Sequence, residues 1–225
     1  MRRRAAPLLV ALLAFAIPPV LLGNALLAVA QPWLVGAVYA APGVPGPSID
    51  LSGEERRALG VTGVRSIQPW AGNGVEELRG ARLPSGGQAF DAREVSHMED
   101  VRRLVRGLLV AWLLAAALLA GTALAASRRA GALRRGTRAG ALLTLGAFGA
   151  VGLAMLADFS GAFTAFHELF FSGDSWRFAG GDTLRSLYPD AFWSWAAGAL
   201  AALVLAQAAA LLLWSIRGRG SARAA

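Results

Sequence analysis

The sequence contains no cysteine, no lysine and only two histidines among its 225 residues. Without cysteine the chain has no disulfide bond, no thiolate nucleophile, no iron–sulfur cluster and no Cys-ligated zinc. Charged residues are also scarce, because they make up 16% of the chain whereas roughly a quarter is usual in soluble domains. Hydrophobic residues make up 56%. This balance argues against an ordinary soluble protein.

Long uncharged segments take the place of the missing charge. Residues 5–30 form an apolar stretch longer than the roughly 20 residues that cross a ~30 Å hydrocarbon core. Similar stretches follow at residues 104–126, 140–157 and 191–216, and Arg106 is the one charge in the first of these three. We therefore predict an all-α membrane protein with four transmembrane helices and a large outer loop, mostly helical or irregular, between the first two.

These spans divide the chain into three predicted parts. The predicted parts are a first transmembrane helix at residues 1–38, an extracytoplasmic loop domain at 39–95, and transmembrane helices two to four at 96–225. A second extracytoplasmic loop is predicted at residues 159–190 within the third part.

The first outer loop carries ordered local signals. Ser52 is followed three residues later by Glu55, which is the spacing of a capping box and predicts a short helix. We expect that helix to end at Gly60 and residues 61–67 to be extended. Three aromatic residues of the loop are expected either to form a small core or to lie at the membrane surface: Trp33, Trp70 and Phe90.

The arginines predict an orientation. Half of the 22 arginines flank the spans at residues 2–4, 128–138 and 217–223, whereas all 14 carboxylates lie in or beside the other two loops. Because arginine-rich flanks remain in the cytoplasm, both termini and the middle loop are predicted to be cytoplasmic. The net charge of +8 then reflects membrane topology, and no nucleic-acid partner is expected.

A cleaved signal peptide is the alternative for the N-terminal segment. Arg2 to Arg4, the apolar run and the Ala-Val-Ala sequence at residues 28–30 fit that pattern. The run is longer than a usual signal sequence and contains Pro18 and Pro19 in its middle. These features favour an uncleaved, kinked helix.

Both histidines are predicted to lie at the outer mouth of the helix bundle. His97 stands just before the second span, where Glu94, His97 and Asp100 recur every three residues. On a helix these side chains lie close to one face, so a carboxylate there would orient the imidazole and fix its tautomer. Two helix starts fit this region, one at Asp91 and one at Ser96, each with a glutamate three residues later.

His167 stands just beyond the third span, among phenylalanines. Phe163, Phe170 and Phe171 are four before, three after and four after it, which places them on the same helical face. Apolar surroundings favour a neutral imidazole that accepts a proton. The bland alternative for both histidines is that they, like the aromatic residues, only pack at a membrane interface.

Familiar catalytic motifs are absent. His167 and Glu168 begin an H-E-x-x-H pattern, but position 171 is Phe, and no phosphate-binding, dinucleotide-binding or nucleophile-elbow motif occurs. Zinc bound by His97, His167 and a carboxylate remains an alternative. Our prediction is that the chain uses no metal and no cofactor.

Two runs carry a resemblance to a known family. They are EVSHMEDV at residues 94–101 and FHELFF at residues 166–171, followed by Asp174, Trp176, Pro189 and Phe192. These residues resemble the Lit family of bacterial integral membrane proteins, the lipoprotein intramolecular transacylases. The similarity covers nearly the whole chain, and Trp193 departs from it where a second Phe is expected.

The resemblance implies acyl transfer at the outer leaflet of the bacterial cytoplasmic membrane. In Lit the acyl chain moves from the sn-2 ester of a lipoprotein's diacylglyceryl cysteine to the amine of the same cysteine. The implied partners are that diacylglyceryl lipoprotein and membrane lipid, and the substrate supplies its own nucleophile. Another outer-leaflet lipid hydrolase or transferase, or a non-enzymatic partner-binding or assembly protein, remains an alternative.

The resemblance and the residue chemistry together give the predicted site. The predicted catalytic residues are His97, His167, Asp100 and Glu94. The predicted substrate-binding residues are Arg102, Arg103, Phe170, Phe171 and Trp176. We take His167 as the base toward the amine and His97 as the group that polarises or protonates the ester, while the opposite assignment stays open.

Overall fold

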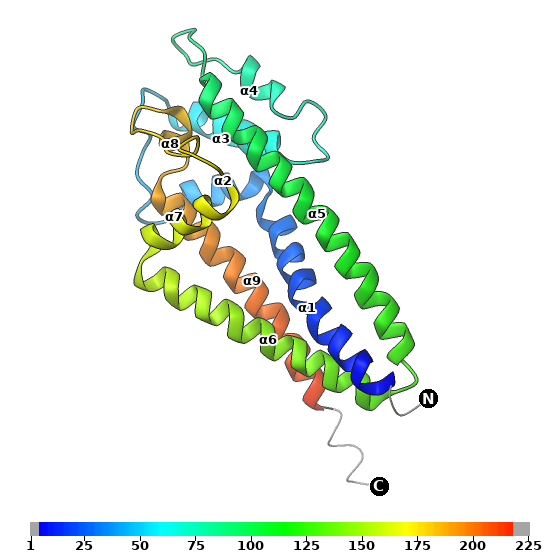
Figure 1. Cartoon of the computed structure of the whole chain (residues 1–225). Helices are drawn as coiled ribbons and strands as arrows, with labels where there is room; N and C mark the ends of the chain where they lie inside the picture. Colours follow the sequence, from blue (N-terminus) through cyan, green and yellow to red (C-terminus); the bar gives the residue numbers. More distant parts are fainter. Residues whose placement is uncertain (1–4, 218–225) are drawn as a thin grey trace. The chain divides into compact units, whose positions relative to one another are not determined.

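The computed structural model describes residues 5–217, and regular structure in that range is helical (Figure 1). Its helices in chain order are α1 (Ala5–Val29), α2 (Pro32–Tyr39), α3 (Gly53–Ile67), α4 (Glu76–Gly80), α5 (Ala92–Ala126), α6 (Ala130–Ala157), α7 (Phe159–Phe170), α8 (Thr183–Leu187) and α9 (Asp190–Arg217). Over residues 5–217 the one β feature is an isolated bridge between Arg82 and Gln88. The prediction of an all-α fold is confirmed.

Four of the helices are long and apolar enough to cross a membrane. They are Ala6–Val29, Ala92–Ala126, Ala130–Ala157 and Asp190–Arg217. The predicted spans lie almost entirely within them. Helices α5 and α6 begin well before their apolar segments, so each also carries a polar turn or more at its N-terminal end.

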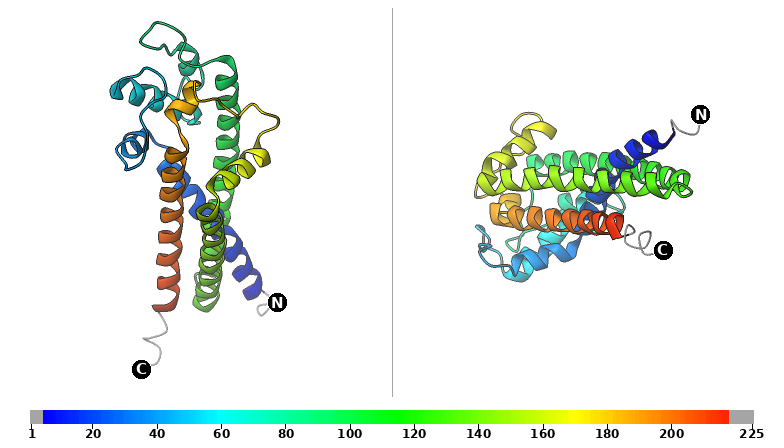
Figure 2. Two further views of the ribbon diagram at one scale, coloured as in Figure 1. Left: turned by 90° about the vertical axis from the view of Figure 1, so that its left-hand side faces the viewer. Right: turned by 90° about the horizontal axis from the view of Figure 1, so that it is seen from below.

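The chain divides into two compact units. The first unit comprises Met1–Leu26, Leu108–Leu156 and Leu200–Ala225, and in its described part the long apolar helices lie alongside one another (Figure 2). Its core joins Ile17 and Leu21 of α1 to Val204 of α9. Close approach is possible because glycines of α6 face α1: a Cβ at Gly140 would lie 2.8 Å from Ile17.

Polar side chains inside this unit satisfy one another. The indole N–H of Trp112 donates to Asn24 Oδ1 at 3.0 Å, and Asn24 Nδ2 donates to Gln207 Oε1 at 3.0 Å. Such pairing joins α5, α1 and α9 through hydrogen bonds between side chains. These groups therefore serve helix association.

The second unit comprises Leu27–Gly107 and Ala157–Ala199. Helix α3 is central in it and packs against α2, α4 and α8. Two tyrosines reach across the packing: Tyr39 Oη donates to Leu187 O at 2.9 Å, and Tyr188 Oη donates to Gly60 O at 2.6 Å. The side chains of Leu78 and Phe90, which belong to this unit, are fully buried.

Helix α3 corrects one prediction. The capping box is present, because Ser52 Oγ accepts from Glu55 N at 3.2 Å and Glu55 accepts from Ser52 N at 2.8 Å. The helix does not end at Gly60, and residues 61–67 are helical. A Cβ at Gly60 would lie 2.6 Å from Tyr39 Oη, and one at Gly63 would meet Tyr188 Oη. These glycines make room for the tyrosines, so they do not terminate the helix.

The three aromatic residues singled out between α1 and α5 have different environments. Phe90 is fully buried, whereas Trp33 is 54% exposed and Trp70 is 50% exposed. Phe90 thus belongs to a core, as one of the two sequence interpretations proposed, and the tryptophans do not. The segment predicted as the first transmembrane helix, 1–38, contains both α1 and most of α2. The loop boundaries at 39–95 and 159–190 refer to the membrane and remain predictions.

Candidate functional site

The first turn of α5 is fixed by Glu94. Asp91 and Glu94 form a reciprocal cap, because Glu94 N donates to Asp91 Oδ1 at 2.7 Å and Asp91 N donates to Glu94 Oε2 at 2.8 Å. The other carboxylate oxygen, Oε1, accepts from Leu184 N at 2.6 Å. Glu94 is only 2% exposed and joins the start of α5 to α8. Of the two helix starts considered, the one at Asp91 is confirmed.

His97 lies one turn further along α5, in an aromatic setting. It is 7% exposed, and its ring stands edge-on to Phe171 and Phe178, with ring centroids 5.1 Å and 5.4 Å away. Its Nδ1 atom is buried and has no hydrogen-bond partner among the described residues. A buried imidazole without a counter-charge is favoured in its neutral form.

His167 lies near the end of α7, and Asp158 caps the start of that helix by accepting from Gly161 N. The Nδ1 atom of His167 lies 2.7 Å from Phe163 O. Because a carbonyl oxygen only accepts, Nδ1 carries the proton in this bond and Nε2 keeps its lone pair. The side chain is 9% exposed, and burial lowers its pKa below the ordinary 6.5, although the bond to Phe163 opposes part of that shift.

The two imidazoles lie together, as the sequence interpretation requires. Their ring centroids are 6.3 Å apart, and the planes differ by 27°. Phe171 contacts both rings, at 5.1 Å from His97 and 5.6 Å from His167. Phe163 lies 4.0 Å and Trp176 4.8 Å from His167. Two buried imidazoles therefore share one aromatic-lined site.

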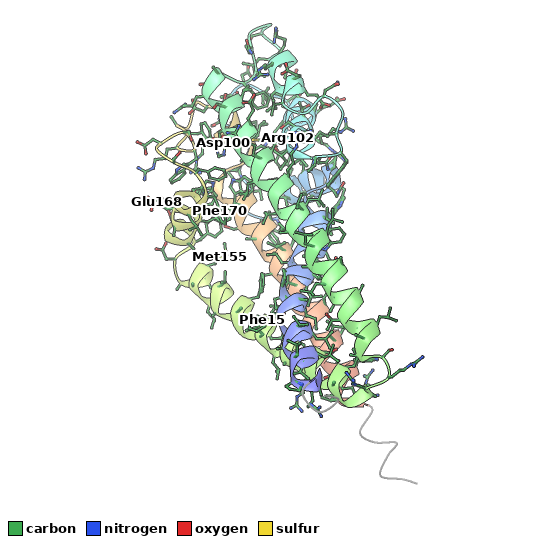
Figure 3. The ribbon with its side chains drawn as sticks, turned by 45° about the vertical axis from the view of Figure 1, so that its right-hand side comes forward. Phe15, Asp100, Arg102, Met155, Glu168 and Phe170 are labelled. Carbon is green, nitrogen blue, oxygen red and sulfur yellow. The ribbon has the colours of Figure 1, made fainter. Side chains whose placement is uncertain are left out.

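The expected hydrogen bond between His97 and a carboxylate is absent from the described residues. Both oxygens of Glu94 accept backbone N–H groups, and Asp100 pairs with Arg103 one turn further along α5. On the helix, Glu94 and Asp100 lie on nearly the same side as His97. Backbone N–H groups bind Glu94 instead, and Arg103 binds Asp100. The expectation that Glu94 or Asp100 orients the His97 ring is therefore wrong. Figure 3 labels Asp100 on α5.

Arg102 is buried for a structural reason. Its guanidinium donates to Ser66 O at 2.6 Å, Gln68 O at 2.7 Å and Ala71 O at 3.2 Å, and it is 9% exposed (Figure 3). These carbonyls end or follow α3, where a cation interacts favourably with the helix dipole. Arg102 thus fastens the chain after α3 to α5.

Arg102 and Arg103 also line a surface hollow of about 400 Å³. Its lining residues are Gly72, Asn73, Gly74, Val75, Glu76, Glu99, Arg102, Arg103 and Arg106. Neither histidine is among them. The structure therefore does not bring the two arginines into the site of the imidazoles.

Of the three aromatic residues predicted to bind substrate, two lie beside the imidazoles and one does not. Phe171 and Trp176 lie beside the imidazoles, whereas Phe170 packs against Phe166 at 4.9 Å and is 45% exposed (Figure 3). Sequence reasoning missed Phe178, which contacts His97. Phe178 lies in an irregular segment without periodicity, so spacing gave no signal for it. Arg93 holds it by placing its guanidinium carbon 5.1 Å from the ring centroid.

No group of three or more His, Asp or Glu side chains suitable for a metal occurs within residues 5–217. The zinc alternative therefore lacks a third ligand in that range. The site contains two imidazoles with aromatic surroundings. His167 has a free basic nitrogen, Nε2, and His97 has a buried Nδ1 without a partner among the described residues. Such groups are suited to moving protons between oxygen and nitrogen atoms of a bound substrate.

The four membrane-length helices place the chain in the class of multi-pass membrane proteins, and its two buried histidines lie together. A match to a family model then identifies the family of this chain. The family model described as "Lipoprotein intramolecular transacylase Lit" matches residues 74–193, which is more than half of the chain. The chain belongs to the Lit family, a family of enzymes, and the family resemblance is confirmed.

Relatives of known sequence and structure agree. The chain is 28% identical over 155 residues to an uncharacterized protein of Aquifex aeolicus strain VF5, a match that covers 69% of this chain and 68% of that protein. The structure of the membrane integral lipoprotein intramolecular transacylase Lit from Bacillus cereus is similar with a TM-score of 0.76. That match has 16% identity and covers 96% of this chain and 98% of that one.

A second structure of the Bacillus cereus protein carries a histidine replaced by arginine. It is similar with a TM-score of 0.72 and 16% identity, and the match covers 98% of this chain and 96% of that chain. At these identities the likeness establishes the fold. The chain is accordingly an all-α, membrane-integral protein with four transmembrane helices.

Proposed function

We propose that this chain moves an acyl chain within a bacterial lipoprotein, from the sn-2 glyceryl ester to the amine of the N-terminal cysteine. One observation carries the proposal: His97 and His167 lie 6.3 Å apart, and His167 has a free Nε2 because its Nδ1 is bonded to Phe163 O. Membership of the Lit family supports the reaction class. Histidine-substituted structures of the Bacillus cereus protein support histidine as the working side chain.

The proton transfers follow from the two rings. An α-ammonium group has a pKa of about 8 and must lose a proton before its nitrogen attacks the ester. The free Nε2 of His167 takes that proton, and the amine then adds to the ester carbonyl carbon. When the tetrahedral intermediate collapses, the glycerol oxygen leaves and needs a proton. The nitrogen gives up a second proton as it becomes an amide, and an imidazolium delivers one proton to the glycerol oxygen. The other proton, equal to the one that the ammonium lost, passes to solvent, so the enzyme ends in its starting state.

His97 completes the pair on the leaving side. It has no carboxylate partner, and its Nδ1 is unoccupied, so its ring is available to the ester oxygens. Only one proton need be shared, because a second charge beside the first would be repelled within 6.3 Å. The two residues thus act as one acid–base unit.

The burial of the site favours transfer over hydrolysis. His97 is 7% and His167 9% exposed, and phenylalanine and tryptophan rings surround them. Water is therefore kept from the ester carbonyl, while the substrate amine is held next to it by its own covalent structure. A hydrolase acting on the same ester needs the opposite arrangement.

We also propose that the site faces the outer leaflet of the cytoplasmic membrane, with both termini cytoplasmic. The arginine-rich segments at residues 2–4, 128–138 and 217–223 support this orientation. Because the chain has no cysteine, single cysteines report sidedness cleanly. A membrane-impermeant maleimide added to intact cells will label Ser85→Cys and leave Ser127→Cys unlabelled. Labelling of Ser127→Cys alone contradicts the orientation.

Mass spectrometry of lipoprotein N-termini tests the reaction. Cells or vesicles with the wild-type chain are expected to contain lipoproteins whose acyl group has moved to the cysteine nitrogen. The His167→Ala variant, expressed at equal level, is expected to lack them. Free fatty acid together with an unacylated amine indicates a hydrolase. Unchanged lipoproteins together with a phenotype that needs residues 42–90 indicate a partner-binding protein.

A further inference from the structure

Trp176 has a buried polar group that nothing in its surroundings uses. Its indole Nε1 is inaccessible to solvent and has no hydrogen-bond partner among residues 5–217. Buried indole N–H groups normally find an acceptor, because leaving one unpaired costs stability. Two less buried tryptophans do have acceptors: Trp112 donates to Asn24 Oδ1 at 3.0 Å, and Trp195, which is 46% exposed, donates to Pro42 O at 3.2 Å. The more deeply buried Trp176 has none.

The unpartnered group lies at the histidine pair. The Trp176 ring centroid is 4.8 Å from that of His167, and the planes differ by 32°. The guanidinium carbon of Arg177 lies 5.0 Å from the ring centroid of Trp176. Arg177 in turn contacts Glu168 and Asp174, each at 3.3 Å. The indole ring therefore contacts both a cation and the imidazole of the proposed base.

Packing alone does not require this residue. A phenylalanine would present a similar apolar face to His167, as Phe163 and Phe171 already do at 4.0 Å and 5.6 Å. An indole N–H is a donor and nothing else, so it neither takes the amine proton nor competes with the imidazoles for it. Its remaining use in such a site is to stabilise negative charge.

We propose that the indole N–H of Trp176 stabilises the oxyanion formed during acyl transfer. The inference rests on the proposed function. When the amine nitrogen bonds to the ester carbon, the carbonyl π electrons move to oxygen, and the indole N–H donates to that oxygen. The pair returns as the bond to the glycerol oxygen breaks, and the proton that the amine nitrogen loses on becoming an amide passes through His167 to the glycerol oxygen. No other reactant is needed.

Replacing Trp176 by phenylalanine removes the donor and keeps an aromatic ring. Turnover of a synthetic diacylglyceryl lipopeptide should fall about 10²- to 10³-fold in kcat, which is typical of losing one oxyanion donor, with little change in KM. The melting temperature should stay near that of the wild type. Trp195→Phe is the matched control, because its indole N–H already has a partner. That control should retain wild-type turnover.

The outcomes separate the inference from the proposed function. A wild-type chain that forms no N-acyl product removes both. An active wild type with a folded, fully active Trp176→Phe variant removes the oxyanion role alone. A loss that appears only in KM, or in step with a lower melting temperature, also contradicts it and makes Trp176 a packing residue.

A measurement on the wild-type chain covers the case in which the variant does not fold. A phosphonate lipid analogue, whose charged oxygen mimics the oxyanion, is added to the detergent-solubilised protein. The indole proton of Trp176, identified by its proximity to the His167 ring, should shift downfield as it gains a hydrogen bond. An unshifted resonance at saturating phosphonate overturns the inference.

Discussion

Two buried polar regions on the first turns of α5 differ in how their hydrogen-bonding groups are used. Around Arg102 the guanidinium has three backbone carbonyls as acceptors, from Ser66, Gln68 and Ala71. Around His97 the ring Nδ1 has no partner, and the nearby Trp176 Nε1 has none either. Both regions are almost fully buried. Under the proposed function, unused donors and acceptors, more than burial, distinguish the substrate site from a structural one.

Arg56 shows the limit of this criterion. It is 6% exposed, and its Nε and Nη2 atoms also lack partners. Its guanidinium carbon lies 4.0 Å from the Tyr39 ring centroid, so the cation is held by the ring face. A guanidinium does not release its proton in proteins and cannot act as a base. Unused buried donors and acceptors therefore mark a candidate site only where the same region also holds a group that can take up or release a proton, as the histidines do.

The largest expected effect is on the histidine pair. His167→Ala and His97→Ala should each lower turnover by about 10²- to 10⁴-fold, the usual contribution of general acid–base catalysis. Because the rings act as a unit, the double variant should be little worse than either single variant. Turnover is measured on purified protein by mass spectrometry of the lipopeptide product. If the loss of turnover in the double variant equals the product of the two single losses, the rings do not act as a unit.

Arg102→Met tests the other side of the comparison. It leaves carbonyls after α3 without a donor and should lower the free energy of unfolding by about 1–3 kcal/mol. Turnover per folded molecule should stay near the wild-type value. Thermal unfolding and lipopeptide turnover are measured on the same preparation. Normal stability with lost turnover would return Arg102 to substrate binding, as the sequence first suggested.

Glu94→Gln is expected to have a smaller effect of the same kind. The amide retains one oxygen acceptor for Leu184 N or Asp91 N and loses the charge, so stability should fall by about 1 kcal/mol. Turnover per folded molecule and its pH profile should be unchanged, because Glu94 does not bond to His97. A displaced pH profile in the variant is evidence for the catalytic role predicted from sequence.

Asp100→Asn should have the smallest effect. Its partner Arg103 has a side chain that is 70% exposed, and exposed ion pairs contribute little to stability. The free energy of unfolding should change by less than about 0.5 kcal/mol, and turnover should not change. Chemical denaturation and turnover together are the check. A tenfold loss of turnover would show that Asp100 acts in the reaction after all.

The parts of the fold that follow local rules were predictable. Apolar runs longer than a bilayer gave the spans, and the spacing of Asp91 and Glu94 gave the start of α5. Gly60 was misread as a helix end, because its reason for being glycine is Tyr39, which lies far away in the sequence. Only tertiary packing distinguishes a glycine that ends a helix from one that admits a neighbour.

The candidate site was predictable to the same extent. The two histidines were singled out because they are the only ones in the chain, and they do lie together. Helical spacing placed Glu94 and Asp100 near His97, but it does not reveal which backbone N–H or arginine takes each carboxylate. Phe178 and the unused N–H of Trp176 depend on the path of an irregular segment, which no periodicity encodes.

The tautomer of His167 tests the central claim most directly. Nitrogen NMR of histidine-labelled protein in detergent reports which ring nitrogen carries the proton. Because burial lowers the pKa of His167 below 6.5, fewer than half of the rings should be cationic at pH 6.5. We predict a neutral ring protonated at Nδ1, with a lone pair at Nε2. A ring protonated at Nε2, or a cation at this pH, contradicts His167 as the base.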